Sequence, residues 1–138
     1  MTNLVVLRGR LNRPPGERLL PSGTRLATFD LTVPAPAQAP ALAAVAAARR
    51  ADAVPLSWFD PPAWVADLGV GTELVVVGRV RRRFFQGNGL QSRTEVVVDH
   101  AAPARHTVRS AAVVRRALSV IDGLAGSPDD EDQAARRR

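Results

Sequence analysis

Residues 71–98 restrict the fold of this chain more than any other stretch does. Two β-branched runs, at residues 72–80 and 93–98, flank a short segment that contains an Asn-Gly pair. Asn and Gly both tolerate the positive φ angles that tight hairpin turns require. The stretch therefore predicts a β-hairpin whose turn lies at residues 86–89.

The first strand of this hairpin presents two different faces, because successive side chains point to opposite sides. Leu74, Val76 and Val80 share an apolar face. The other face changes from apolar to basic and ends in an aromatic ring, with Val75, Val77, Arg79, Arg81, Arg83 and Phe85 in order. Such a face is typical of a nucleic-acid platform, where guanidinium groups contact phosphates and bases stack on rings. The alternative is a solvated tip whose charges prevent aggregation at an exposed edge.

Three further segments predict strands. Residues 3–11 and 25–33 alternate apolar side chains with polar or basic ones. Residues 53–59 form a third strand, which suits an edge position because it contains a proline. Alanine and proline fill residues 34–52, which predict a long flexible loop with some helical turns.

Residues 61–68 predict a short helix, because Asp60 is a suitable N-cap and Pro61 suits the first helical position. The order of elements is then strand, strand, loop, strand, short helix, long strand, strand. This order matches an all-β, five-stranded Greek-key barrel of the oligonucleotide-binding (OB) fold, with a short helix between the third and fourth strands. We expect this domain to span residues 1–107, followed by a C-terminal helix and a disordered tail at residues 108–138.

Charge and composition narrow the functional classes. All 19 basic residues are arginines, and the net charge of +6 lies in residues 1–109, where 14 arginines oppose 8 acidic residues. A basic domain favours polyanionic partners. The absence of cysteine excludes disulfides and thiolate metal sites. Ser57, Asp60 and His100 do not form a recognisable catalytic triad, so we expect neither enzyme activity nor a metal or cofactor.

The sequence also bears on localisation. No apolar stretch approaches the roughly 20 residues that span a bilayer. The short apolar run at the start has no basic segment before it, and it reads as a strand and not as a signal peptide. We therefore expect a cytoplasmic, nucleoid-associated protein without membrane contact.

Several segments together resemble the bacterial single-stranded DNA-binding protein family. They are an opening strand and turn at residues 3–18, the run at 21–33, Trp58-Phe-Asp-Pro leading into the helix, and the hairpin at 71–98. The similarity covers roughly residues 3–100, apart from the long loop. No single motif is specific, and the order and spacing of the segments carry the resemblance.

The resemblance implies a protein that binds single-stranded DNA with little sequence preference in replication, recombination or repair. It places the base-stacking aromatics at Phe59 and Phe85. With the basic strand faces, it predicts the following DNA-contacting residues: Arg8, Arg10, Phe59, Arg79, Arg81, Arg83, Phe85 and Arg93. Arg49, Arg50 and Trp58 are further candidates, although Trp58 faces the other way, which favours core or subunit packing. A homo-oligomer (tetramer or dimer) and replication or repair proteins as partners are also implied.

Two departures from that family motivate an alternative. Tryptophans that the family carries after the second strand and early in the third are replaced here by an Ala-Pro segment and by Ala53-Val54. The acidic residues 129–132 are followed by three arginines, where the family ends in a hydrophobic terminus. The alternative is a primosome-type accessory or protein-interaction OB module with weak nucleic-acid binding. RNA binding is a third hypothesis, which differs in contacts to the 2′-hydroxyl.

Overall fold

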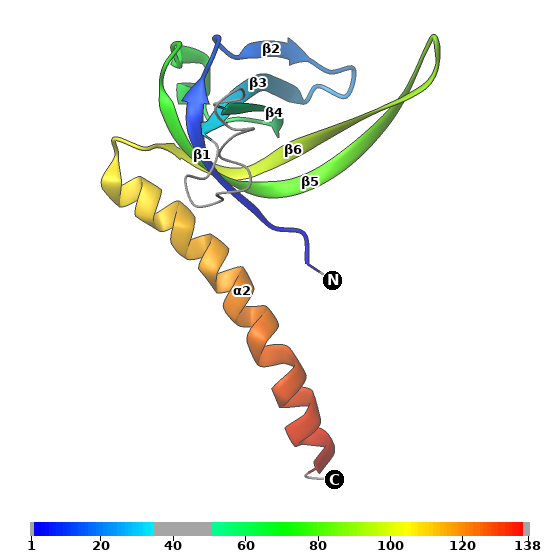
Figure 1. The fold of residues 1–138 in the computed structure, drawn as a ribbon, viewed down its shortest axis with the longest axis vertical. Helices are drawn as coiled ribbons and strands as arrows, with labels where there is room; N and C mark the ends of the chain where they lie inside the picture. The colour runs from blue at the N-terminus through cyan, green and yellow to red at the C-terminus, as the bar shows by residue number, and fades with distance from the viewer. Residues whose placement is uncertain (1, 35–50, 137–138) are drawn as a thin grey trace, which may run out of the picture.

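The computed structural model describes residues 2–34 and 51–136, with side chains as far as residue 123 in the last helix. Within these residues the strands gather at one end of the molecule, and a long helix extends away from them (Figure 1). The elements are β1 (Val5–Leu11), β2 (Gly16–Leu19), β3 (Arg25–Pro34), β4 (Ala51–Phe59), the 3-10 helix η1 (Ala63–Asp67), β5 (Glu73–Gly87), β6 (Gly89–Pro103) and α2 (Thr107–Arg136).

All six strands belong to one sheet, in the order β1-β5-β6-β4-β3-β2. β1 also pairs with β3, at Leu11 and Leu31, so the line of paired strands returns to its start. Every pair is antiparallel except β4 with β6, which run parallel where Ser57 lies beside Val97. The chain therefore has the all-β, OB-like fold that the sequence predicts.

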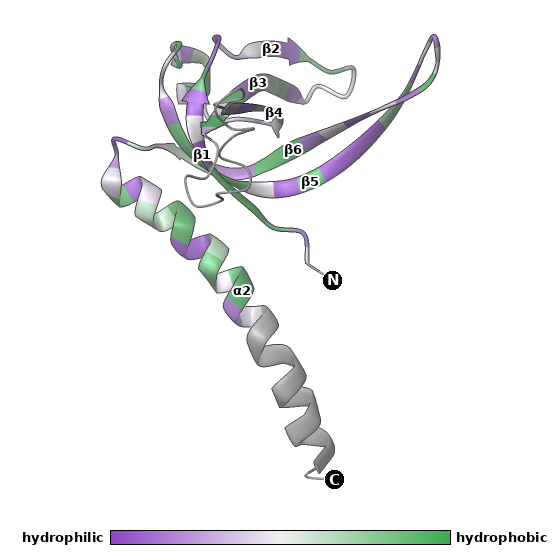
Figure 2. Ribbon diagram, in the orientation of Figure 1, coloured by the Kyte–Doolittle hydropathy of each residue, from purple (hydrophilic) through white to green (hydrophobic). Residues whose placement is uncertain are grey.

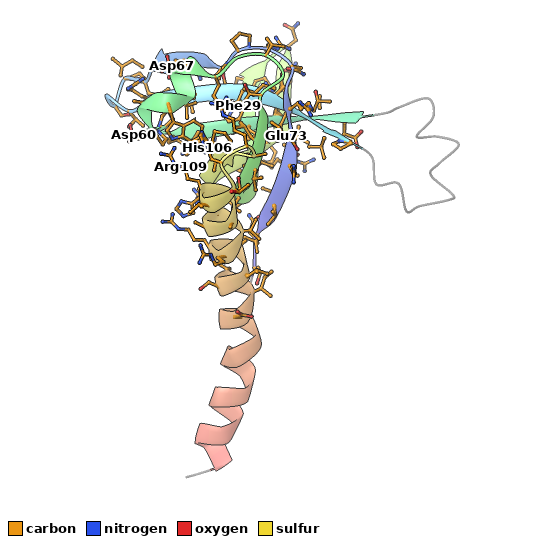
Figure 3. The ribbon with its side chains drawn as sticks, turned by 90° about the vertical axis from the view of Figure 1, so that its left-hand side faces the viewer. Phe29, Asp60, Asp67, Glu73, His106 and Arg109 are labelled. Atoms are coloured by element: carbon orange, nitrogen blue, oxygen red, sulfur yellow. The ribbon has the colours of Figure 1, made fainter. Side chains whose placement is uncertain are left out.

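The hydrophobic core lies inside the curved sheet, because each strand points alternate side chains inward. Leu31, Leu74 and Val76 are fully buried in this core, and Phe29 lies among the strands (Figure 3). Trp58 is buried as well, and its ring meets that of Trp64 edge-on with centroids 5.7 Å apart. Trp58 is therefore a core residue, which removes it from the candidate DNA contacts.

A second, smaller apolar cluster joins α2 to the outer face of the sheet. Val75 and Val77 of β5 and Ala102 of β6 pack against Val113 and Ala117 of α2. The apolar half of the β5 face is thus covered by α2, and only its basic half remains available to a ligand. No helix among the described residues is long and apolar enough to cross a membrane.

The distal part of the β5–β6 hairpin, residues 81–94, extends beyond the other strands and is called the arm below (Figure 1). β6 continues to Pro103, past Val98, where the sequence predicts its end. The register shifts by one residue opposite Val77 and Gly78, so that Asp99 is an extra residue in β6. The shift explains why the prediction is wrong, because it interrupts the alternation that marks a strand in the sequence.

The short helix differs from its prediction in type, bounds and capping. It is a 3-10 helix that lies between the fourth and fifth of six strands, because β2 adds a strand to the predicted five. Pro62 occupies the N-cap and makes no side-chain capping bond. Asp60 does not cap the helix, because the helix begins at Ala63, two residues after the predicted start at Pro61. Asp60 instead has a φ of 50° and accepts a hydrogen bond from the backbone N–H of Arg25 at 3.2 Å.

Other bounds also differ from the prediction. The sequence does not predict β2, because its four residues show no strand pattern. β2 forms a strand only because it pairs with β3. β3 and β4 extend into the predicted loop, as far as Pro34 and from Ala51, and the rest of the loop lies outside the described residues together with Arg49 and Arg50. α2 continues to Arg136, through the segment expected to be disordered.

Candidate nucleic-acid interface

An open groove of about 570 Å³ lies on the outer side of the sheet, on the side away from the core. Its floor is formed by β3 and β4, one wall by β2 and the turn before it, and the other wall by the base of the arm. It is lined by Arg13, Pro14, Gly16, Arg18, Thr28, Phe29, Asp30, Pro55, Leu56, Ser57, Arg83, Arg93 and Glu95. Four arginines and two acidic residues therefore meet here, and the groove carries an excess of positive charge.

Arginines stand on both walls of this groove. Arg18 on one wall, and Arg83 and Arg93 on the other, form no ion pair with any carboxylate of the described residues. Arg13 lies 3.4 Å from Asp30, and both members of that pair line the groove. A groove with uncompensated guanidinium groups on both sides suits an extended polyanion that runs between them.

Arg83 and Arg93 are directly opposite each other in the β5–β6 ladder. Like charges in this position repel each other and destabilise the strand pair. The next pair toward the core, Arg81 opposite Glu95, has opposite charges and forms an ion pair. The uncompensated pair therefore stands where the arm borders the groove, and a bound anion would relieve its repulsion.

Phe59, at the end of β4, is half-buried and lies on the same outer side as the groove floor, because Trp58 before it points into the core. The guanidinium of Arg81 lies over the Phe59 ring, 5.2 Å from its centroid. Arg81 also donates two hydrogen bonds to Oε1 of Glu95, from Nη2 at 2.5 Å and from Nε at 3.2 Å. The structure thus brings together Phe59 and Arg81, two residues predicted to contact DNA.

Glu95 is the one buried acidic residue among the described side chains, at 5% exposure. Its Oε2 accepts a hydrogen bond from the Ser57 hydroxyl at 2.6 Å. Burial raises the pKa of Glu95, but the hydrogen bonds from Ser57 and Arg81, together with the charges of Arg81 and Arg83, outweigh burial and leave the pKa below its ordinary value. Glu95 is therefore an anion that lines the groove and is satisfied by its own neighbours.

Phe85 is exposed and lies farther out on the arm, on the same face as Arg83 and opposite Gln91. Phe84 and Arg82 share the other face, with the guanidinium 6.0 Å from the ring centroid. Figure 2 shows the arm as mostly hydrophilic with short apolar segments near its tip. Phe85 is available to a base that follows the arm outward from the groove.

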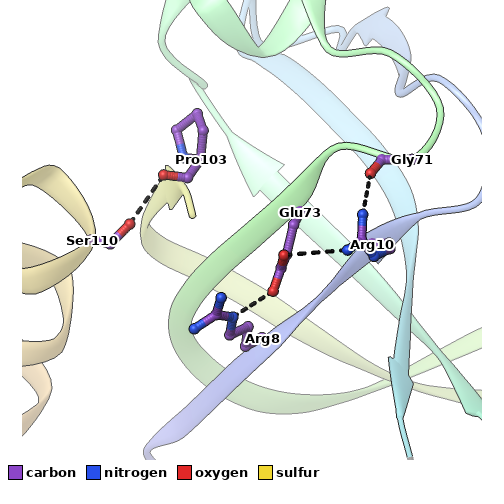
Figure 4. Close-up of polar contacts among 6 residues, drawn as sticks. All are labelled: Arg8, Arg10, Gly71, Glu73, Pro103 and Ser110. Carbon is purple, nitrogen blue, oxygen red and sulfur yellow. Dashed lines mark hydrogen bonds and ion pairs between the residues drawn. The ribbon is translucent and has the colours of Figure 1, made fainter. Parts of the chain in front are cut away.

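Three of the predicted arginines lie away from the groove. Arg8 and Arg10 on β1 both contact Glu73, at the start of β5, and Arg10 also donates to the carbonyl oxygen of Gly71 at 3.2 Å (Figure 4). The hydrogen bond from Arg8, with its charge and that of Arg10, lowers the pKa of Glu73 despite opposing desolvation. Arg79 pairs with Asp99 at 3.0 Å.

The sequence analysis assigned these arginines to DNA-binding faces because side chains alternate along a strand. Alternation shows which face a side chain is on, but not which neighbouring element covers that face at each position. β5 is fifteen residues long, and its first part faces β1 and α2 while only its last part borders the groove. Sequence reasoning also missed Arg13, Arg18, Ser57 and Glu95. Arg13 and Arg18 flank a proline-glycine turn that carries no strand pattern, and Ser57 and Glu95 are single polar residues within apolar runs.

His106 lies on the surface beside the start of α2, and Asp60 lies at the end of β4 (Figure 3). No group of three or more histidine or acidic side chains in the described part of the chain is arranged to hold a metal ion.

No protein family model matches the chain, and no curated protein matches its sequence. Among solved structures, the wild-type single-stranded DNA binding protein from Thermus aquaticus aligns with a TM-score of 0.55 at 23% identity. A deletion variant of that protein aligns with a TM-score of 0.56 at the same identity. Both alignments cover 74% of this chain and 40% of the other. The resemblance predicted from the sequence is thus confirmed at the level of the fold, and this chain shares its fold with single-stranded DNA binding proteins.

Proposed function

We propose that the protein binds single-stranded DNA in the groove between β2 and the arm, with little sequence preference. The observation that carries this proposal is the set of uncompensated arginines, Arg18, Arg83 and Arg93, on the two facing walls. The shared fold with single-stranded DNA binding proteins supports the same ligand. Phosphates would contact the guanidinium groups, and unpaired bases would face the floor and the exposed Phe85.

A single strand fits this site better than a duplex for a physical reason. The groove is open, and its two walls, from β2 and from the arm, both present arginines to a strand that lies between them. A flexible strand can follow a curved surface and turn its bases toward aromatic or guanidinium planes.

Fluorescence anisotropy with labelled oligo-dT, titrated with the full chain over a salt series, tests the proposal. Unlabelled duplex of the same length serves as competitor. We expect single-stranded DNA to bind more tightly than duplex and Arg18→Gln to weaken it, while Arg10→Gln, outside the groove, has a smaller effect. Equal affinity for duplex and single strand, or no binding at low salt, contradicts the proposal.

Two finer proposals follow from the same fold. We expect a homo-oligomer, a dimer or tetramer, which light scattering with and without oligo-dT can measure. We also propose a cytoplasmic role in DNA replication, recombination or repair, without catalytic activity of its own. Loss of damage tolerance in cells that carry the Arg18→Gln variant at normal protein levels would support that role, and unchanged tolerance would argue against it.

A further inference from the structure

The Phe59 ring is not free to receive a base in this structure. The Arg81 guanidinium lies over the ring, 5.2 Å from its centroid, within the range of a cation–π contact. A base that stacked directly on Phe59 would have to displace this cation. The ring to which the family resemblance assigns base stacking is therefore already covered on one face by a neighbouring side chain.

Arg81 is held firmly in that position. Nε and Nη2 both donate to Oε1 of Glu95, and the other oxygen of Glu95 accepts the Ser57 hydroxyl at 2.6 Å. Glu95 is buried, and the hydrogen bonds to it keep its pKa below the ordinary value. Displacing Arg81 would leave a buried carboxylate without its cation, which is strongly unfavourable.

The same contacts decide what Arg81 offers to a ligand. Its charge is compensated by Glu95, and part of its hydrogen-bonding edge is already used, so it is a poorer phosphate ligand than Arg83 or Arg93. A guanidinium is planar, and its flat faces stack on aromatic rings and bases. The side chain is 40% exposed, so part of it remains open to solvent.

We propose that Arg81 is the stacking surface for an unpaired base, with Phe59 beneath it as support and Glu95 and Ser57 as positioning residues. The proposal rests on the function proposed above and assigns the base contact in the groove to a cation–ring pair. Arg81 then contacts a base through the flat face of its guanidinium, whereas Arg83 and Arg93 attract phosphates through their charge.

The experiment separates base contacts from phosphate contacts. Anisotropy measures the affinity of each variant for oligo-dT and for an abasic oligodeoxynucleotide of the same length, which has the phosphates without the bases. Arg81→Lys keeps the charge and removes the planar group. We expect its affinity for oligo-dT to fall about 5- to 150-fold, the range for loss of one stack, while affinity for the abasic strand changes less than about twofold.

Arg82→Lys is the matched control. Arg82 is the adjacent residue, its guanidinium lies over the Phe84 ring, and it faces away from the groove. Its replacement should therefore leave the affinities for oligo-dT and for the abasic strand unchanged. Phe59→Leu should weaken oligo-dT binding less than Arg81→Lys does, because an apolar support remains. The reverse order, with Phe59→Leu causing the larger loss, would mean that the base stacks on the ring itself and would overturn the proposal.

Glu95→Gln gives an independent reading if Arg81→Lys proves unstable by circular dichroism. It removes the carboxylate that compensates and orients Arg81, so abasic DNA should bind more tightly while the preference for oligo-dT over abasic DNA falls. An unchanged preference overturns the inference. Wild-type protein that binds neither strand at low salt overturns the proposed function, which is a different result from wild-type binding with an unaffected Arg81→Lys variant.

Discussion

The opposed pair Arg83 and Arg93 predicts that DNA affinity and stability change in opposite directions when one charge is removed. The two arginines face each other across the β5–β6 ladder, both line the groove, and neither forms an ion pair with a described carboxylate, although the charge of Arg83 helps to lower the pKa of Glu95. Replacing Arg83 with Gln keeps a long polar side chain and ends the repulsion. We therefore expect Arg83→Gln to be more stable and to bind single-stranded DNA less tightly.

Both magnitudes follow from the geometry. A like-charge pair directly opposite in a ladder costs on the order of 0.2–1 kcal/mol, so the free energy of unfolding should rise by about that amount. Each phosphate contact on a single strand contributes about −0.7 to the slope of log affinity against log salt. The double variant Arg83→Gln/Arg93→Gln should therefore reduce the slope by about 1.4, which corresponds to about a sevenfold smaller loss of affinity between roughly 50 and 200 mM salt.

The assay combines urea unfolding of the free protein with anisotropy of labelled oligo-dT over the salt series. Arg82→Gln is the control, because Arg82 lies on the other face of the same strand and should change neither the slope nor the affinity by a comparable amount. An unchanged salt slope for the double variant would refute the assignment of these arginines to phosphates. Lower stability of Arg83→Gln would refute the claim that their juxtaposition is unfavourable.

Three further results are expected. Gly78→Ala should destabilise the fold by about 1–3 kcal/mol in urea unfolding, because its Cβ would lie 2.2 Å from the Val97 carbonyl oxygen; a neutral effect would contradict this close approach. Trp58→Ala should cost about 3–5 kcal/mol as a core truncation, whereas Trp58→Phe should fold and bind oligo-dT normally, and a selective loss of binding in Trp58→Phe would place that ring at the ligand. The pKa of Glu95 in the folded protein lies below its ordinary value of 4.5, so ionised Glu95 stabilises the protein above pH 4.5. This contribution disappears as the pH falls through the folded pKa. The free energy of unfolding, measured from neutral to acid pH, should therefore decrease, and the decrease should be smaller in Glu95→Gln.

The hairpin and the order of five of the six strands along the chain were predictable from the sequence because they depend on local patterns. The β-branched runs on either side of Asn88 and Gly89 determine both strands and the turn, and Gly89 has the positive φ of 92° that such a turn requires. The faces of β5 were also predictable, since alternation continues unbroken from Leu74 through the arm. Phe59 and Phe85 lie outside the core for the same reason.

The composition of the groove was not predictable, because it depends on contacts between distant segments. β2 exists only by pairing with β3, and it supplies a groove wall with Arg18. The partners of the arginines depend on ladder register: Arg81 meets Glu95, while Arg83 meets Arg93. No local signal in the sequence distinguishes Arg81 from Arg83, although Arg81 forms an ion pair with Glu95 and Arg83 forms none with a described carboxylate.

The first part of β5 packs against α2, and its last part belongs to the arm. This arrangement also determines which insertions and deletions in the hairpin the protein tolerates during evolution. Residues added or removed beyond Val80 would leave the core and the α2 contacts in place, because the arm makes neither. Changes of two residues in each strand would preserve which side chains face the groove. A single-residue change in one strand would turn Phe84 toward the groove and Arg83 away from it, because side chains alternate with a period of two. Relatives with longer or shorter arms should therefore differ by even numbers per strand, so the groove chemistry can survive while its reach along the DNA varies.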